Sequence, residues 1–201
     1  MIKVKFCGLS RICDIEGANA LKPEYIGFVF APQSRRCILP EKALELKSLL
    51  SPGIKAVGVF VNQQPEFAAE LLNSDIIDIA QLHGNEEDDY IEHLRRLTHK
   101  PIIQAFRITG VEEVITARNS IADCILLDAG AGTGTSFDWK LVQNIKRPYF
   151  LAGGLNAQNA RAALNILKPY ALDVSSGIET NGLKDTRKMA EFIHAVRKEA
   201  L

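Results

Sequence analysis

Residues 25–61 read YIGFVFAPQSRRCILPEKALELKSLLSPGIKAVGVFV, and this stretch decides the fold. Its two ends, 25–30 and 56–61, are apolar runs that are nearly continuous rather than alternating, as expected for strands covered on both faces. Between them, 40–50 has helical periodicity, with leucines on one face and charged side chains on the other, and Pro40 suits the first helical turn. The order strand, helix, strand predicts a parallel sheet.

The same unit recurs along the whole chain. Apolar runs typical of strands lie at 2–7, 25–30, 56–61, 77–82, 102–106, 124–127, 149–152 and 171–174. Helical periodicity also marks 65–72, 88–97, 157–167 and 184–198, with Asn156 as a candidate cap. Eight units without a linker predict a single (β/α)8 TIM barrel over 1–201, near the lower limit of about 200 residues for that fold. A doubly wound open sheet, which has the same local pattern, is the alternative.

Composition excludes several classes of function. The 201 residues include 24 basic and 24 acidic side chains, so the net charge is zero. Without a basic stripe the chain lacks the field that attracts a polyanion, and we expect neither nucleic acid nor a membrane as partner. No apolar stretch is long enough for a signal peptide or a membrane span, which favours a cytoplasmic protein. The four cysteines show no CxxC pair, so free thiols are expected.

Polar residues and glycines follow the predicted strands. In a barrel of this kind the active site is built at the C-terminal ends of the strands, so these residues are the candidates for function. They are Cys7, Arg35, Arg36, Asn62, Gln81, His83, Arg107, Asp128, Gly132, Gly134, Gly153, Gly154, Ser175, Ser176 and Gly177.

The loops after the last two strands indicate a phosphate site. Barrels commonly bind phosphate there through backbone N–H groups, and glycine lets the backbone approach the oxygens closely. The sequence has glycines at 153–154 and a Ser-Ser-Gly run at 175–177, with Gly132 and Gly134 in the loop after the sixth strand. Tight turns without a ligand are the alternative for each loop taken alone.

Cys7 and Asp128 each end a predicted strand and are candidates for proton transfer. A thiolate at Cys7 serves as a base if nearby positive groups lower its pKa, although most free cysteines are small buried hydrophobic residues. A carboxylate in a partly closed pocket has its pKa raised and can donate a proton, although a loop cap is the alternative for Asp128. Arg36 offers a planar fork to a carboxylate or phosphate, unless it is a plain surface arginine. His83 is the only histidine at a strand end, so a catalytic metal is not expected.

Several motifs resemble the phosphoribosylanthranilate isomerase family. They are KVKFCGL at 3–9, YIGFVFAP at 25–32 with Ser34 and Arg36, VGVFVN at 57–62, QLHG at 81–84, LD at 127–128, GTG at 132–134, FDW at 137–139, LAGGL at 151–155 and DVSSGIE at 173–179. The resemblance covers essentially the whole chain in order. It implies a (β/α)8 barrel that uses neither cofactor nor metal.

The resemblance also implies a reaction and a role for each motif. The family performs an Amadori rearrangement in tryptophan biosynthesis, converting N-(5-phospho-β-D-ribosyl)anthranilate to 1-(2-carboxyphenylamino)-1-deoxy-D-ribulose 5-phosphate. By position, Cys7 is the general base and Asp128 the general acid, while Arg36 holds the anthranilate carboxylate, a role that Arg35 is placed to share. Gln81 and His83 contact the substrate, and the glycine and serine loops hold its phosphate. The expected partner is this small phosphosugar-anthranilate molecule, bound by a monomer or a homodimer.

Two other functions remain open from the sequence. The aminoaldose isomerase of histidine biosynthesis performs the same rearrangement on another substrate. That enzyme has a carboxylate at the position of Cys7 and shows half-barrel repetition, and this chain shows neither feature. A barrel kept only for binding or scaffolding would have lost the acid or the base, and this chain retains both Cys7 and Asp128.

Overall fold

The computed structural model describes residues 2–128 and 139–197. Eight parallel strands form a closed barrel in the order in which they occur in the chain. They are β1 (Lys3–Cys7), β2 (Tyr25–Val29), β3 (Lys55–Phe60), β4 (Ile79–Leu82), β5 (Ile102–Arg107), β6 (Cys124–Asp128), β7 (Tyr149–Ala152) and β8 (Ala171–Val174). Because β1 pairs with both β2 and β8, the ring is closed, which confirms the predicted TIM barrel and excludes the open sheet.

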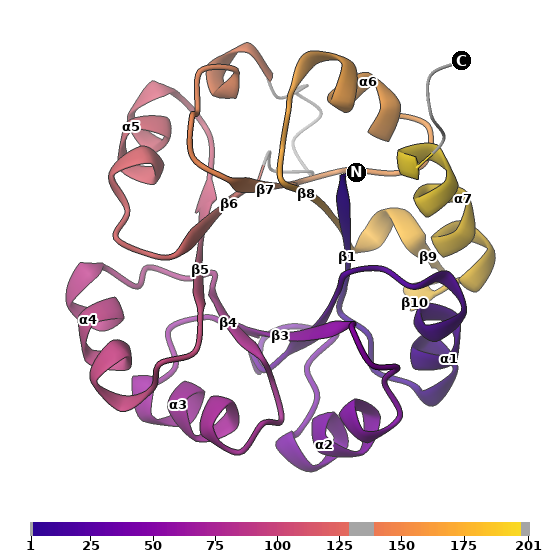
Figure 1. Cartoon of the computed structure of the whole chain (residues 1–201), viewed down its shortest axis with the longest axis horizontal. Helices are drawn as coiled ribbons and strands as arrows, with labels where there is room; N and C mark the ends of the chain where they lie inside the picture. The colour runs from indigo at the N-terminus through magenta and orange to yellow at the C-terminus, as the bar shows by residue number, and fades with distance from the viewer. Residues whose placement is uncertain (1, 129–138, 198–201) are drawn as a thin grey trace.

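Helices surround the strands as an outer ring (Figure 1). They are α1 (Ile12–Leu21), α2 (Pro40–Ser48), α3 (Pro65–Asn73), α4 (Asp88–Leu97), α5 (Val111–Asn119), α6 (Ala160–Ile166) and α7 (Thr186–Arg197), with short 3-10 turns η1 (Trp139–Val142) and η2 (Ser176–Ile178). None of these described helices is both long and apolar enough to cross a membrane.

Two helices, α1 and α5, are missing from the sequence prediction, and a third begins later than expected. The buried face of α1 includes Asp14 and Gly17 beside apolar residues, so it shows no clear apolar stripe. In α5, exposed Ile115 and buried Val114 place apolar residues on both faces. Before α6, the side chain of Asn156 accepts hydrogen bonds from the backbone of the next turn, and the helix starts only at Ala160.

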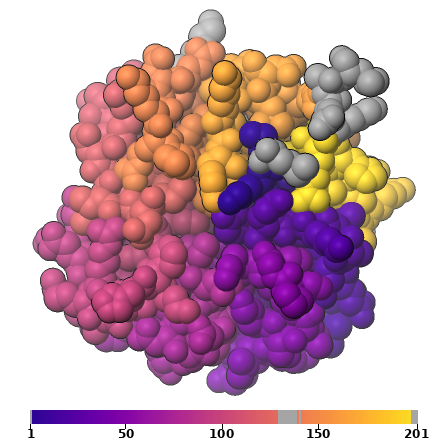
Figure 2. All heavy atoms as spheres, in the orientation of Figure 1, coloured from indigo at the N-terminus to yellow at the C-terminus, as the bar shows by residue number. Residues whose placement is uncertain are grey.

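Side chains fill the barrel, so the ring of strands is not a pore. Figure 2 shows the face of Figure 1 closed by packed atoms. Near the start of the strands, apolar residues such as Tyr25, Leu126 and Phe150 form an interior cluster. Further along, the buried charges of Lys5 and Asp173 interrupt this apolar interior. The apolar end forms part of the packed core, and the polar end is where a functional site is expected.

A small hairpin follows β8 and was not predicted. Its strands, β9 (Glu179–Thr180) and β10 (Leu183–Lys184), are antiparallel and place Glu179 opposite Lys184. The connecting residues Asn181 and Gly182 have φ values of 51° and 79°. Such left-handed pairs match the turn that joins two-residue hairpins, for which Asn-Gly is the preferred sequence. The turn therefore fixes two oppositely charged residues side by side.

Candidate active site

A cavity of about 400 Å³ lies at the C-terminal ends of the strands. It brings together residues from widely separated parts of the chain. The predicted site residues that line it are Cys7, Arg36, Gln81, His83, Asp128, Gly153, Gly154, Ser175 and Ser176. A neighbouring hollow of about 550 Å³ shares His83 and Asp128 with it and extends toward Asn62 and Arg107.

The remaining predicted site residues lie elsewhere. Gly132 and Gly134 fall outside the described residues, so their expected contact with phosphate stays a prediction. Gly177 does not line this cavity but packs against the loop after β7. A Cβ atom at Gly177 would lie 1.9 Å from the backbone oxygen of Leu155. A larger cavity of about 660 Å³, lined by residues of 84–89 and 104–120, contains none of the predicted site residues.

Cys7 lies against a buried ion pair. The Nζ atom of Lys5 is 3.2 Å from both carboxylate oxygens of Asp173, and the Lys5 side chain has no exposed surface. The pKa of the Cys7 thiol lies above its ordinary value, because burial and the Asp173 carboxylate raise it by more than the positive charges of Lys5 and Lys184 lower it. The lowered pKa that the sequence analysis named as the condition for a base is therefore not found in the free site. The cavity therefore holds a thiol beside a fixed cation, which stabilises the thiolate when the proton leaves.

Gly27 makes room for this arrangement. A Cβ atom at Gly27 would lie 2.8 Å from Cys7 Sγ and 3.3 Å from Lys5 Nζ. The first distance is shorter than real Cβ contacts, so a side chain there would displace the thiol. The glycine of β2 thus sets how closely the thiol and the ammonium group approach each other.

Asp128 ends β6 and faces His83, the residue that follows β4. Asp128 Oδ2 lies 3.4 Å from His83 Nε2, and the Asp128 side chain is 26% exposed. The other ring nitrogen, Nδ1, is 3.1 Å from Gln81 Nε2. The Gln81 amide therefore contacts one side of the imidazole ring while the other side faces the carboxylate. Gln81 thereby orients His83 toward Asp128.

The loops after β7 and β8 lie next to each other at the cavity. Gly153 and Gly154 have φ values of 93° and 61°, a backbone conformation that residues other than glycine rarely adopt. The backbone of Gly177 comes so close to Leu155 that no side chain fits between them. Both loops line the cavity, through Gly153 and Gly154 after β7 and through residues 175–176 after β8. Their binding of phosphate stays a prediction.

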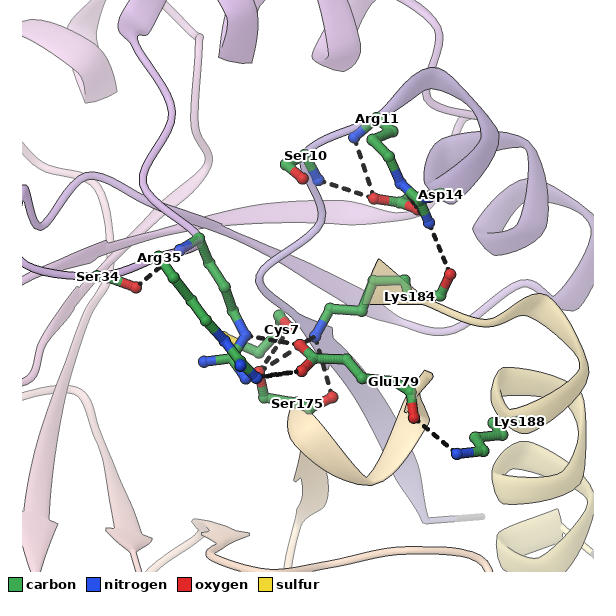
Figure 3. Close-up of polar contacts among 11 residues, drawn as sticks. Cys7, Ser10, Arg11, Asp14, Ser34, Arg35, Ser175, Glu179, Lys184 and Lys188 are labelled. Atoms are coloured by element: carbon green, nitrogen blue, oxygen red, sulfur yellow. Dashed lines mark hydrogen bonds and ion pairs between the residues drawn. The ribbon is translucent and has the colours of Figure 1, made fainter. Parts of the chain in front are cut away.

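Arg36 lines the cavity and is bound by an acidic residue. Its Nε and Nη2 atoms donate to the two carboxylate oxygens of Glu179, over 2.6 Å and 2.9 Å. Hydrogen bonds from Arg36 and Lys184 outweigh the effect of burial and lower the pKa of Glu179 to about 2. Glu179 is therefore ionised at neutral pH. Figure 3 shows its carboxylate facing the Lys184 ammonium group, with Ser175 and Cys7 close by.

Four residues of this region, Lys5, Asp173, Glu179 and Lys184, were not predicted as site residues. Lys5 carried a usable signal, because it lies two positions before Cys7 and side chains two apart on a strand share a face. Asp173 carries the same signal relative to Ser175. Glu179 lies within the DVSSGIE motif at 173–179, and the Asn-Gly pair at 181–182 indicates a turn, but neither signal shows that Glu179 pairs with Lys184 and Arg36.

Among residues 2–128 and 139–197, no group of three or more histidine, cysteine, aspartate or glutamate side chains is arranged to hold a metal ion. The same residues include all four cysteines, which are free thiols, as predicted.

A family model and a curated relative both match nearly the whole chain. The family model described as N-(5'-phosphoribosyl)anthranilate (PRA) isomerase matches residues 4–195. A relative from Thermoanaerobacter pseudethanolicus, named N-(5'-phosphoribosyl)anthranilate isomerase, is 44% identical over 204 residues, covering 98% of each chain.

Two solved structures share the fold over nearly their full length. A phosphoribosyl anthranilate isomerase in complex with reduced 1-(o-carboxyphenylamino)-1-deoxyribulose 5-phosphate has a TM-score of 0.89 and 32% identity, covering 99% of this chain and 100% of that one. Monomers generated from the dimeric phosphoribosylanthranilate isomerase of Thermotoga maritima give a TM-score of 0.87 and 32% identity, covering 98% of this chain and 99% of theirs.

Proposed function

The chain belongs to the N-(5'-phosphoribosyl)anthranilate isomerase family and is an isomerase of tryptophan biosynthesis, and we propose that Cys7 and Asp128 carry out its proton transfers. The observation that supports these roles is that both side chains line one cavity, although they are far apart in the sequence. The cavity also holds an arginine and two backbone loops suited to the two anionic ends of the substrate.

The first step opens the ribose ring. Asp128 donates a proton to the ring oxygen, the bond from that oxygen to C1 breaks, and the nitrogen lone pair forms an iminium ion. In this proposal His83, which contacts Gln81 and lies with Nε2 3.4 Å from Asp128 Oδ2, stabilises the carboxylate that remains. General acid catalysis of this kind contributes about 10²- to 10⁴-fold to a rate.

The second step moves a proton away from C2. The Cys7 thiolate takes this proton, the C–H electrons form a C1–C2 double bond, and the iminium electrons return to nitrogen. The Cys7 thiol then gives its proton to C1 and the C2 hydroxyl proton passes to the Asp128 carboxylate, which yields the ketone and returns both groups to their starting states. Because the iminium nitrogen already accepts the electrons, the proposed mechanism needs neither metal nor pyridoxal. Lys5 stabilises the thiolate through its fixed charge.

The two ends of the substrate are held by different parts of the site. In this proposal Arg36 binds the anthranilate carboxylate, and the backbone at 153–154 and 175–177 binds the phosphate, with Gly132 and Gly134 contributing from the loop after β6. Gln81 and His83 line the same cavity and are the proposed contacts to the rest of the substrate. Clamps at both ends supply the positioning that the chemistry needs.

The proposal extends to the state of the protein in the cell. We propose that residues 1–201 act as one catalytic domain, as a monomer or a homodimer. A cytoplasmic location suits the mechanism, because a reducing compartment keeps the Cys7 thiol free.

The direct test is an activity assay with the purified protein. Phosphoribosylanthranilate, made freshly in the cuvette, loses its anthranilate-type fluorescence as it is isomerised. We expect a loss that is proportional to protein concentration and abolished in a Cys7→Ala, Asp128→Asn double variant. A rate equal to that of the protein-free reaction, or an unchanged rate in the double variant, would contradict the proposal.

A further inference from the structure

Glu179 connects the arginine of the cavity to the loop after β8. The Glu179 side chain is only 4% exposed, yet it binds three basic side chains. Arg35 Nη2 and Arg36 Nη2 donate to Glu179 Oε2, over 2.7 Å and 2.9 Å, and Arg36 Nε donates to Oε1 over 2.6 Å. Lys184 Nζ donates to Oε1 over 2.7 Å. A buried carboxylate with this many charged donors fixes their relative positions.

The way in which Glu179 binds Arg36 leaves part of the guanidinium available. A guanidinium group has five N–H donors, and its side edge, formed by Nε and one Nη, is the edge that Glu179 occupies. The end edge, formed by the two Nη atoms, can still receive a second carboxylate in a two-point contact. Arg36 also lines the cavity, so a carboxylate bound in the cavity is the group for which this edge is suited.

The same carboxylate reaches the proposed phosphate loop. Lys184 Nζ, besides binding Glu179, donates to the backbone oxygen of Ser175 over 3.0 Å and to Ser175 Oγ over 3.2 Å. Ser175 Oγ in turn donates to the backbone oxygen of Cys7 over 3.0 Å. Arg36, the Ser175 loop and the end of β1 are thus joined through one chain of contacts, part of which is drawn in Figure 3.

The charges of this cluster also suit an anionic substrate. Arg35, Arg36 and Lys184 carry three positive charges, and Glu179 carries one negative charge. One of these positive charges balances the charge of Glu179, and the remaining positive charge beside the cavity attracts and retains anions. Glu179 holds the arginine in place without cancelling the field of the site.

We propose that Glu179 is a positioning residue that aims the end edge of Arg36 at the carboxylate of the substrate. This inference rests on the proposed role of Arg36. It assigns to Glu179 the specificity for N-aryl phosphoribosylamines that bear a carboxylate next to the nitrogen.

The test compares two substrates. One is N-(5-phosphoribosyl)anthranilate, and the other is the corresponding aniline derivative, which lacks the carboxylate; product formation is followed by chromatography. In Glu179→Gln we expect kcat/KM for the anthranilate compound to fall about 10- to 100-fold, because a misaimed group costs that much. For the aniline compound we expect a change below about 3-fold. Equal losses on both substrates, or no loss on either, would overturn the inference.

A double-mutant cycle gives an independent readout on the natural substrate. If Glu179 acts through Arg36, adding Glu179→Gln to Arg36→Ala changes kcat/KM by less than about 2-fold, whereas the same change in the wild-type background is large. A loss of equal size in both backgrounds means a structural role only and contradicts the inference. If Arg36→Ala itself leaves KM unchanged, the proposed role of Arg36 is wrong, which is a different failure.

Two further variants guard against unfolding as an explanation. Glu45→Gln removes a matched glutamate from an exposed ion pair with Lys42 and should change neither the activity nor the circular dichroism spectrum. If Glu179→Gln does not fold, Glu179→Asp replaces it, because it keeps the negative charge but its shorter side chain breaks the two-point contact with Arg36. The same selective loss on the anthranilate compound is expected, and equal loss on both compounds refutes the inference.

Discussion

Single side chains in this site act through the groups packed against them. Cys7 on its own is a buried thiol, and burial raises its pKa. The fixed charge of Lys5, held by Asp173, opposes this shift and supplies a partner for the thiolate. Asp128 depends in a similar way on His83, whose orientation is set by Gln81. Each proposed catalytic residue thus has a neighbouring polar side chain, Lys5 for Cys7 and His83 for Asp128.

The Lys5 charge predicts a shift in the pH profile. Since the thiol must lose a proton before it acts as a base, kcat/KM rises with pH through the pKa of Cys7. Removing the positive charge in a Lys5→Met, Asp173→Asn variant raises that pKa, because Lys5 lowers it more than Asp173 raises it. The rising limb of the profile therefore moves to higher pH, provided that circular dichroism shows the native fold. An unmoved limb, or one that moves to lower pH, would speak against the role of Lys5.

Arg36 predicts a selective loss of substrate binding. Replacing Arg36 by alanine removes a charge-assisted contact to the carboxylate, which is worth about 1.5 to 3 kcal/mol. We expect KM to rise accordingly, while kcat falls less. Arg35→Ala is the matched comparison, because the Arg35 side chain is 62% exposed and binds the same glutamate. If KM rises in Arg35→Ala and not in Arg36→Ala, the two arginines have been assigned in the wrong order.

The sequence predicts the site residues that end or follow strands, but it does not predict the residues that pair with them, such as Glu179. Cys7, Asp128 and Arg36 could be identified because the ends of parallel strands converge at one face of a barrel. Their partners are set by contacts between distant segments. Glu179 is 143 positions away from Arg36 in the chain, and no local pattern indicates that the two meet.

At the scale of elements, the loops after β7 and β8 must fit closely together. Gly177 meets the backbone oxygen of Leu155, so a methyl group there forces the two loops apart. In Gly177→Ala we expect a KM at least about 10-fold higher and weaker competitive inhibition by inorganic phosphate, because backbone donors move away from the anion. Gly110→Ala is the control, since its added Cβ makes only an ordinary contact. Unchanged inhibition by phosphate in Gly177→Ala would contradict a phosphate site at these loops.

The elements themselves were predictable where their pattern was strong. The strands and α2, α3 and α4 lie close to where the sequence places them, because apolar runs and amphipathic stripes report burial directly. By contrast, α1 has small and charged residues on its buried face, and its packing against the barrel outweighs its weak local signal. The hairpin of β9 and β10 was missed although Asn181 and Gly182 form a typical turn, since its strands have only two residues each.

For the whole molecule, the site also contributes to the stability of the barrel. Glu179 links the segment after β8 to the loop after β2, and its pKa is lowered from 4.5 to about 2. Its charged form therefore stabilises the fold above about pH 4.5, and this contribution is lost as the pH falls through about 2. We expect urea unfolding to show Glu179→Gln less stable than wild type at pH 7, with a difference that shrinks as the pH is lowered toward 2. A difference that stays constant down to that pH would contradict the ionised state of Glu179.

The closed ring of strands is what brings a thiol from the first strand and a carboxyl group from the sixth into one cavity. The most direct measurement is the turnover of folded Cys7→Ala and Asp128→Asn variants with freshly made phosphoribosylanthranilate. The mechanism predicts that each variant keeps the native circular dichroism spectrum and loses at least about 100-fold in kcat. Near-normal turnover in either variant would show that the proton is transferred by another group.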